Sequence, residues 1–580
     1  MRVPMLLLLI AVLAMPSFAR PTGRLVLKTA ILNYEPYING VPYWQACGWP
    51  DPLSNATPVL TEGISKASDN MVLMRLVHTT NVNLFPHTGA INGFGTHRIT
   101  AEQYWQVRTN NFRGAVDAKL GNAGYLAALT GDFPHILGMI ERGEVDHVMI
   151  GGGPYFGYWE TLMVGTGAWQ CNSVPLSWTN ERIVVANCFG TPGTGNGLHN
   201  YGHGLGFGME SWFFNPGAYR ETWHDKDYLA AINDFALFCT CARFTNEIEQ
   251  RIMCGHTHYP PNAPQDYDYN NTNRVWSHTD QWYSYPVMTN PPRFMNNYDW
   301  SWGRTLNGKI DANDTTFQLW WWNHIPRYLG FTRGHLNNWL TYAWNPWKAS
   351  YPLGAGVHTQ RATDLRGWFS YELYCPPGTT QMTVSVQCGR PVYFGIRKNL
   401  VPYAYRCSAE GRSGDDWTTV RDNNHTWILT PSNSFGKGLE GYWYISFGAS
   451  GDAPRWRNTA DYRIETSILP RPQGAATAVQ VTHPQANAVY RAAQVSNAIA
   501  WTVADLPQGA RAVYLAYEQP ARTGAWQPIA EDYHYQMQSP YDWFLPTNVV
   551  GQTRVRVIVE DVYGVCHTNY SAAFSLSRDQ

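Results

Sequence analysis

Short apolar runs alternate with amphipathic segments along the first 200 residues. The apolar runs end in polar or glycine-rich turns, and they span 25–34, 71–77, 146–155 and 182–190. Between them, residues 61–68 and 133–145 carry apolar positions at the spacing of a helix. This order of strand, helix and strand predicts an N-terminal α/β domain with a mostly parallel sheet and helices on both faces.

The pattern changes further along the chain. Residues 200–350 are rich in aromatic side chains and have little regular periodicity, which is typical of chain that forms binding surfaces. Beyond residue 350, short alternating strands replace the helical pattern. We therefore predict a multidomain chain, in which the α/β domain is followed by two C-terminal β-sandwich domains. The expected parts are a signal peptide at 1–19, an α/β catalytic domain with long aromatic loops at 20–355, and β-sandwiches at 365–469 and 480–580.

The N-terminus has the pattern of a secretory signal. Arg2 precedes an apolar run from Met5 to Met15, and Ser17 and Ala19 then place small residues at the two positions that a signal peptidase inspects. This pattern predicts cleavage after Ala19 and a secreted, extracellular protein. The apolar run is too short to cross a bilayer, and no other apolar stretch is long enough, so we expect no membrane span.

Composition narrows the choice of partner. Charged residues make up only 15% of the chain and the net charge is −1, so no basic surface is expected that would hold nucleic acid. Aromatic residues reach 14%, with 26 Trp and 35 Tyr, and such rings stack well on sugars. The expected partner is an extracellular polymer, and among polymers the composition favours a polysaccharide. The ten cysteines are expected to form disulfides mostly, because an exported chain meets oxidising conditions.

The first candidate site residues follow the predicted strands. In α/β sheets, ligands bind beyond the carboxyl ends of the strands. Those ends carry Glu35, Tyr155 and Asn187, which we predict to bind substrate. Glu160 lies among aromatic residues just past the third strand, and we predict it to be a catalytic carboxylate.

A second candidate cluster lies in the stretch HNYGHGLGFGMESWFF at 199–214. His203 precedes glycines that predict a turn, and we assign it to substrate binding. Glu210 follows among apolar residues, which raise a carboxylate pKa and suit a general acid. If the stretch were helical throughout, the two side chains would share a face about 10 Å apart along the axis.

The third cluster is CGHTHYPPNAPQDYDYN at 254–270. Its prolines stiffen the backbone, and a disulfide from Cys254 to Cys239 or Cys241 is expected to anchor it, although these cysteines could also join a zinc site. We predict a loop that lines the site, with His258 as its catalytic residue. His256 and His258 are the candidate metal ligands. The cofactor is left open, with one divalent metal, zinc or calcium, as the candidate.

Acidic residues next to aromatic ones complete the set. Asp268 lies between tyrosines, and Asp280 lies between Trp276 and Trp282. A carboxylate beside an indole ring suits sugars, since the ring stacks and the carboxylate accepts hydroxyl hydrogen bonds. We predict Asp280 to be catalytic and the other three residues to bind substrate.

Three parts of the chain resemble known groups. The motifs NYEPYI, GEVDHVMIGGGPYFGYWE, GHGLGFGMES and CGHTHYPPN, spread over residues 25–350, resemble a group of exported bacterial proteins of unassigned activity. The strands around PPGTTQMTVSV and GYWYISFG at 365–469 resemble a pre-peptidase C-terminal β-sandwich, a module appended to secreted bacterial hydrolases. Residues 480–578 resemble a bacterial immunoglobulin-like domain. The last two resemblances imply extracellular hydrolysis or attachment.

Three functions fit these observations. The first is a secreted hydrolase that cleaves a polysaccharide or glycan with a pair of carboxylates, one acting as acid and the other as base or nucleophile. The second is a metal-dependent secreted peptidase or esterase. The third is a non-catalytic extracellular protein that binds a polymer. The substrate, the disulfide pairing, the strand order and the oligomeric state stay open.

Overall fold

The structure is a computed structural model of a multidomain, strand-rich chain. The residues that it describes are 25–49, 51–54, 63–86, 98, 100–109, 131–153, 156, 160–165, 168, 176, 184–189, 194–213, 234–243, 251–306, 309–332, 335–344, 351–353, 356–364, 368–398, 417–434, 438–448, 459–469, 478–491, 498–504, 510–521, 526–532, 539–543, 545, 550–561 and 566–577. The predicted signal peptide and Tyr155 lie outside them. The chain forms two compact units, one between Arg24 and Gly474 and the other from Ala475 onward, apart from 562–565, which belong with the first.

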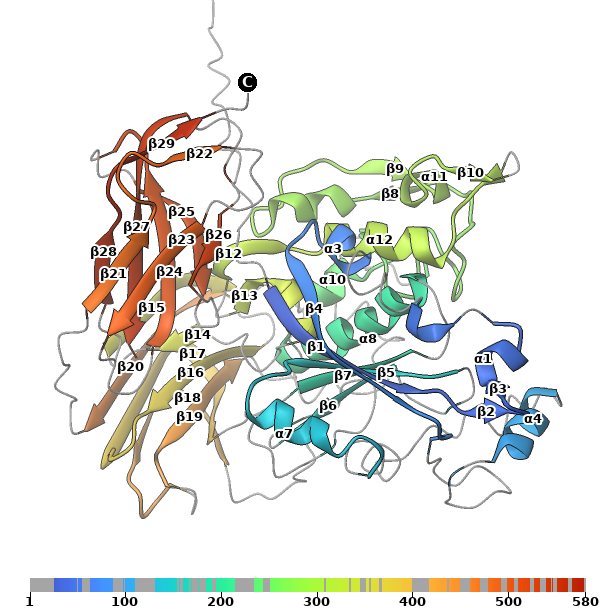
Figure 1. Ribbon diagram of the computed structural model, residues 1–580. Coiled ribbons are helices and arrows are strands. Elements are labelled where there is room, and N and C mark those ends of the chain that lie inside the picture. The colour runs from blue at the N-terminus through green and yellow to red at the C-terminus, as the bar shows by residue number, and fades with distance from the viewer. Residues whose placement is uncertain are drawn as a thin grey trace, which may run out of the picture. The chain divides into compact units, whose positions relative to one another are not determined.

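The first unit contains a five-stranded sheet in the order β4-β1-β5-β7-β6 (Figure 1). Its strands are β1 (Leu25–Tyr34), β4 (Val72–Val82), β5 (His147–Gly151), β6 (Thr161–Val164) and β7 (Val184–Phe189). Strands β4, β1, β5 and β7 run parallel, whereas β6 pairs antiparallel with β7 at the edge. The predicted parallel strands are therefore confirmed, and the antiparallel edge strand β6 is an addition that the apolar pattern did not indicate.

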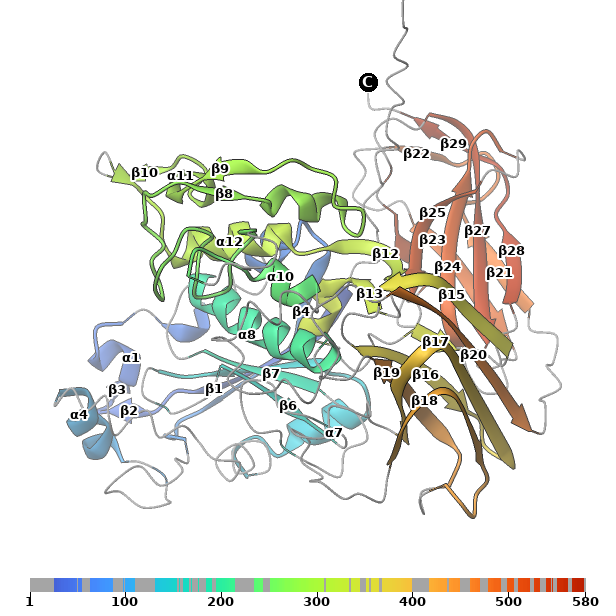
Figure 2. The same ribbon diagram turned by 180° about the vertical axis from the view of Figure 1, so that it is seen from behind.

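Both faces of this sheet are buried. On one face, Leu27 and Ile31 join a core with residues of α3 (Ile64–Ala67), α8 (Thr194–Phe213) and α12 (Asp314–His324). On the other face, Ala30 and Leu32 pack with Ile136 and Ile140 of α7 (His135–Glu141). Figures 1 and 2 show α8 and α7 on opposite sides of the sheet. Alternate side chains of a strand point to opposite faces, so an apolar strand such as β1 needs helices on both.

Short elements complete the N-terminal part of this unit. They are β2 (Tyr37–Ile38), β3 (Val41–Pro42), α1 (Tyr43–Ala46), α4 (Ala101–Thr109), α10 (Asp234–Phe238), β8 (Val275–Ser277), η3 (Thr279–Ser284), β9 (Arg293–Met295), α11 (Asn297–Trp300), β10 (Thr305–Leu306), β11 (Lys309–Ile310), β12 (Arg327–Thr332), β13 (His335–Asn338) and η4 (Trp339–Ala343). Many of the tryptophans here fill the core rather than the surface, and Trp282, Trp321, Trp322, Trp339 and Trp344 are fully buried.

Residues 351–469 form a seven-stranded sheet in the order β14-β16-β19-β17-β20-β15, in which β18 also pairs with β17. The strands are β14 (Tyr351–Leu353), β15 (Gly356–Asp364), β16 (Trp368–Cys375), β17 (Gln381–Lys398), β18 (Trp417–Leu429), β19 (Gly441–Gly448) and β20 (Thr459–Leu469). The long strand β17 pairs with β20 along its first half and with β19 along its second half, so the sheet wraps around one apolar core.

The second unit consists of two sheets around a core of its own. One has the order β21-β23-β26, and the other has the order β22-β29-β27-β24-β25, with β28 paired to β27. The strands are β21 (Ala478–His483), β22 (Val489–Arg491), β23 (Ala498–Ala504), β24 (Ala510–Glu518), β25 (Trp526–Asp532), β26 (Tyr541–Asp542), β27 (Gly551–Asp561), β28 (Cys566–Tyr570) and β29 (Phe574–Ser577). This is the expected β-sandwich. No helix in the described part of the chain is long and apolar enough to cross a membrane.

Candidate metal centre

Helix α8 presents two histidines on one face. His199 and His203 lie one turn apart, and their Nε2 atoms are 3.2 Å from each other. The predicted glycine-rich turn is wrong, because the helix is continuous from Thr194 to Phe213. The glycines serve close packing instead: a Cβ on Gly202 would lie 2.7 Å from Thr257 Oγ1, so a larger residue would push the helix away from the loop that it contacts.

The loop at 251–271 brings a third histidine to this face. At its start Gly255 has φ +74°, and a Cβ there would lie 1.9 Å from the carbonyl oxygen of Tyr259. Glycine adopts this left-handed backbone conformation without strain. Gly255 thereby begins a tight turn in which His256 and Tyr259 exchange two backbone hydrogen bonds of 2.8 Å. The turn ends beside His258, whose ring then faces α8.

Side chains from other elements fix this loop. Trp321 of α12 donates its indole N–H to the carbonyl of Gly255 at 2.9 Å, and the Tyr269 hydroxyl donates to the carbonyl of Thr257 at 3.0 Å. The expected disulfide at Cys254 is not shown, because Cys254 is a buried free thiol whose pKa is raised by burial. Packing and hydrogen bonds therefore hold the loop in this structure.

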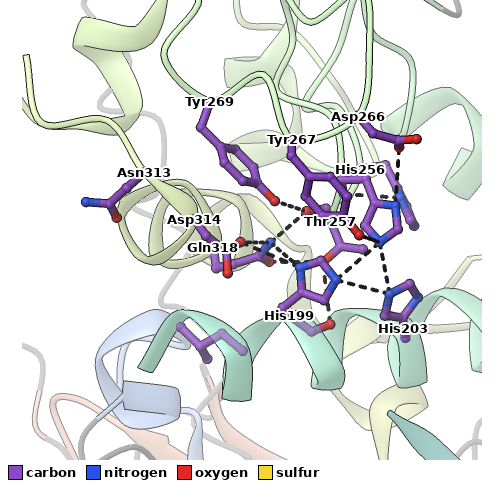
Figure 3. A network of polar contacts seen from close by, with 12 residues as sticks. His199, His203, His256, Thr257, Asp266, Tyr267, Tyr269, Asn313, Asp314 and Gln318 are labelled. Atoms are coloured by element: carbon purple, nitrogen blue, oxygen red, sulfur yellow. Dashed lines mark hydrogen bonds and ion pairs between the residues drawn. The ribbon is translucent and has the colours of Figure 1, made fainter. Parts of the chain in front are cut away.

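The rings of His199, His203 and His258 converge on one point. Figure 3 shows the first two on α8. Their Nε2 atoms form a nearly equilateral triangle: His199 to His203 is 3.2 Å, His199 to His258 is 3.2 Å, and His203 to His258 is 3.1 Å. They are the only such cluster of histidine, cysteine or acidic side chains among the described residues. A zinc ion about 2.05 Å from each nitrogen would subtend N–Zn–N angles of about 100°, close to tetrahedral.

The remaining nitrogens of two of these rings face carboxylates. His199 Nδ1 lies 3.5 Å from Asp314 Oδ1, and His258 Nδ1 lies 3.4 Å from Asp266 Oδ1. A carboxylate in this position holds the Nδ1 proton and leaves the Nε2 lone pair for a metal. Gln318, one turn after Asp314, donates its Nε2 to Asp314 Oδ1 at 3.1 Å and so fixes the carboxylate.

The electrostatics agree with neutral metal-binding imidazoles. Burial lowers the pKa of His258 to about 4, and the neighbouring His199 adds to this effect. Burial would raise the pKa of Asp314, but hydrogen bonds from His199, Gln318 and Tyr269 and the charge of His199 together outweigh it, and the pKa of this carboxyl is lowered. At neutral pH the histidine is therefore uncharged and the carboxylate is charged, as metal binding requires.

Two further side chains lie near His258. Glu160, directly before β6, is within electrostatic reach of His258 and opposes the lowering of its pKa. The hydroxyl of Tyr267 lies 3.3 Å from His258 Nε2. His203 and His258 are only partly buried, so the cluster is accessible to solvent. An accessible three-histidine site resembles catalytic zinc sites, which keep one position open.

The structure brings together three of the residues chosen from the sequence, namely Glu160, His203 and His258. His256 is not a member of the triangle. It is buried, and its Nδ1 accepts a hydrogen bond of 3.5 Å from the backbone N–H of His258. The cluster that could hold a metal ion therefore joins His258 to the two histidines of α8 and does not include His256.

Two other predicted residues have structural roles. Asn187 is buried in β7, where it accepts a hydrogen bond of 2.9 Å from His147 and donates one of 2.8 Å to Thr161, so no substrate reaches it. Trp282 is fully buried, with an exposed fraction of 0%, and it packs against neighbouring aromatic rings. Both assignments to substrate binding are corrected on this ground.

Three of the remaining predicted residues contact side chains other than the three histidines. Asp280 forms an ion pair with Arg293 at 2.6 Å, and Glu35 accepts from Trp44 Nε1 at 2.9 Å. Asp268 accepts from the side chain of Asn271 at 2.8 Å. Glu210 lies on α8, but its side chain is outside the described residues.

Trp276 is the predicted sugar-binding residue with the most open surface. Its side chain is 55% exposed and its ring centroid lies 4.0 Å from that of Phe294, on the paired strand β9. It could contact a polymer.

Sequence reasoning missed His199, Asp266 and Asp314. The spacing of His199 and His203 carries a signal, since two histidines four apart on a helix face are a common metal-binding pair. In the helical zinc motif HExxH, a glutamate follows the first histidine, whereas here that position is Asn200. No local signal identifies Asp314, which lies more than 100 residues after His199 in the chain.

No family model matches the chain, and no curated protein matches it. Solved structures that match in part include fibronectin(III)-like modules of Clostridium thermocellum CbhA, at 17% identity over 18% of this chain and 100% of that chain, with a TM-score of 0.13. A second is the glycoside hydrolase domain of Endo-D from Streptococcus pneumoniae R6, at 11% identity over 38% of this chain and 36% of that chain, with a TM-score of 0.17. A third is a Clavibacter michiganensis expansin mutant in complex with cellohexaose, at 12% identity over 32% of this chain and 68% of that chain, with a TM-score of 0.11. TM-scores this low do not establish a common fold, so we base no conclusion about this chain on them.

Proposed function

We propose that this protein is a metal-dependent hydrolase whose metal is held by His199, His203 and His258. The observation that carries the proposal is the triangle of Nε2 atoms with sides of 3.1 to 3.2 Å. Three imidazole nitrogens that point at one centre cannot all hydrogen-bond to one another, whereas a metal ion satisfies all three lone pairs. Nitrogen ligands favour zinc or another transition metal over calcium, which prefers oxygen.

The arrangement suits activation of water for attack on an ester or amide carbonyl. A metal in such a site lowers the pKa of bound water and polarises the substrate carbonyl. Glu160 is the candidate general base, because its carboxylate is within electrostatic reach of His258 and so of the proposed metal. Glu160 would supply the carboxylate that the HExxH motif has in its second position, where this chain has Asn200.

We retain an extracellular glycan polymer as the proposed substrate, with an ester or amide group on the glycan as the bond that is cleaved, and with secretion by the predicted signal peptide. The exposed pair of Trp276 and Phe294 supports it, since flat aromatic surfaces stack on sugar rings. The alternative of a hydrolase that uses two carboxylates and no metal is less well supported. Its candidate Asp280 is bound by Arg293, and the pair of Glu160 and Glu210 does not account for the three convergent histidines.

Metal analysis of the purified protein tests the proposal first. We expect about one zinc or similar ion per chain, removed by a chelator and restored by added metal. His199→Ala, His203→Ala and His258→Ala should each lose it, while His135→Ala, a histidine of α7 outside the triangle, should keep it. Failure of the wild-type protein to bind any transition metal would overturn the proposal, as would retention of metal by all three variants.

Activity should then separate binding from chemistry. Glu160→Gln should keep the metal and lose about 10²-fold or more in the rate of hydrolysis of chromogenic acyl esters, the usual range for a general base. Wild-type rate in Glu160→Gln would remove Glu160 from the proposed mechanism.

A further inference from the structure

Tyr267 faces the same nitrogen that the proposed metal would use. Its hydroxyl lies 3.3 Å from His258 Nε2, and its ring centroid lies 4.7 Å from that of His258. The ring is also nearly parallel to that of His199, at 21° and 6.0 Å. The Tyr267 ring therefore packs against that of His258 and lies beside that of His199 (Figure 3), and its hydroxyl is next to the corner of the triangle that His258 Nε2 forms.

The neighbouring residue contacts the other nitrogen of the same ring. Asp266 Oδ1 lies 3.4 Å from His258 Nδ1, so two consecutive residues contact the two nitrogens of one imidazole. This geometry needs an unusual backbone. Tyr267 has φ +60°, which is unfavourable for a residue with a Cβ, and its N–H donates to the carbonyl of His258 at 2.8 Å. Unfavourable backbone of this kind is found preferentially where a side chain must be held in place.

An imidazole nitrogen has one lone pair or one proton, but not both. A metal on His258 Nε2 would use that lone pair, so the Tyr267 hydroxyl could no longer donate to it. A tyrosine hydroxyl carries its proton at neutral pH and is therefore a donor. It would then need another acceptor at the same place.

We propose that Tyr267 is a catalytic residue that donates a hydrogen bond to the oxygen in the open coordination position of the metal. This inference rests on the proposed metal centre. The oxygen is that of water before reaction and of the substrate carbonyl as negative charge develops on it. Such donors stabilise the developing oxyanion, and no bond other than this hydrogen bond forms or breaks at the phenol.

A ligand-binding experiment tests this role without knowledge of the substrate. The full-length protein, freed of metal, is loaded with Co²⁺, whose visible absorption reports on its coordination. Acetohydroxamate, an anion that binds metals through oxygen, is then titrated into the wild-type protein, Tyr267→Phe and the control Tyr298→Phe. Tyr298 is a tyrosine of α11 that is 59% exposed, against 56% for Tyr267, so the control removes one hydroxyl from a comparably exposed ring.

We expect all three proteins to bind one Co²⁺ with equal affinity. The acetohydroxamate Kd should rise about tenfold or more in Tyr267→Phe, the range for loss of a hydrogen bond to a charged group, and should not change in Tyr298→Phe. A Kd within twofold of wild type in Tyr267→Phe would overturn the inference, and so would loss of Co²⁺, which would make Tyr267 a ligand or a structural residue. If the wild-type protein itself binds no Co²⁺, the proposed function fails rather than the role of Tyr267 alone.

Discussion

Replacing Asp314 by asparagine should weaken metal binding without removing a metal ligand. The carboxylate lies 3.5 Å from His199 Nδ1, and its side chain is 31% exposed while that of His199 is 11% exposed. A hydrogen bond from a neutral imidazole N–H to a carboxylate contributes about 1.5 to 3 kcal/mol. A partly exposed carboxylate such as Asp314 falls toward the lower end of this range.

Loss of the charge makes His199 a poorer electron donor and releases its Nδ1 proton from a fixed partner. Loss of a partner of this kind typically lowers metal affinity tenfold to a hundredfold, or about 1.4 to 2.7 kcal/mol, and we expect the same of Asp314→Asn. The metal Kd can be measured at pH 7.5 by competition with a chromogenic chelator.

The control is Asp311→Asn, the same change three residues earlier. Asp311 accepts a hydrogen bond of 3.0 Å from Asn313 Nδ2 near the start of α12. Asp314 is also in the first turn of α12, so its replacement should cost about 0.3 to 1 kcal/mol of helix stability, visible in unfolding of the metal-free protein. If Asp314→Asn binds metal within twofold of Asp311→Asn and wild type, the carboxylate does not support His199 and our reasoning about the site is refuted.

Three further predictions concern the fold that holds the site. Gly255→Ala should lower Tm by several degrees and weaken metal binding, because the added Cβ would lie 1.9 Å from the carbonyl oxygen of Tyr259. The control is Gly40→Ala, which should leave metal binding unchanged, because Gly40 also has a positive φ of +81° but a Cβ there would meet no atom within 4 Å. Equal effects of the two changes on metal binding would contradict this. Trp282→Ala should cost about 3 to 5 kcal/mol in urea unfolding and Trp276→Ala less than about 1 kcal/mol, because only the first is buried; the reverse order would show that burial is not the cause. Burial lowers the pKa of His147 from 6.5 to about 4, so the unfolded chain binds more protons between these values, and the free energy of unfolding should fall as pH drops through this window. His147→Gln should flatten that slope in urea titrations at pH 4.5 and 7, and an unchanged slope would exclude His147 as the source.

Much of the sheet followed from the sequence. The apolar runs at 25–34, 71–77, 146–155 and 182–190 correspond to β1, β4, β5 and β7. Strands β1 and β5 are buried on both faces and are therefore apolar nearly throughout. The same reasoning placed α3 and α7. It did not find β6, whose four residues are too few to form a distinct pattern.

Helix α8 shows where local reasoning fails. Glycine lowers helix stability by about 1 kcal/mol at each position, so the run at 202–208 predicts a turn. In the folded protein the helix persists, because it is packed against the sheet and the loop, and the absence of side chains at Gly202 and Gly204 lets it approach them closely. Tertiary packing outweighs the intrinsic preference.

The sequence by itself determined the alternation of strands and helices and the presence of reactive histidines at 203 and 258. Only the tertiary structure decided that His199 completes their triangle, that Asp266 and Asp314 support two of the rings, and that Trp282 is core. The physical reason is that strand and helix periodicity are local properties of the chain. A metal centre depends on where α8, α12 and a loop meet, and that meeting is set by long-range packing of apolar surfaces that no spacing of residues records.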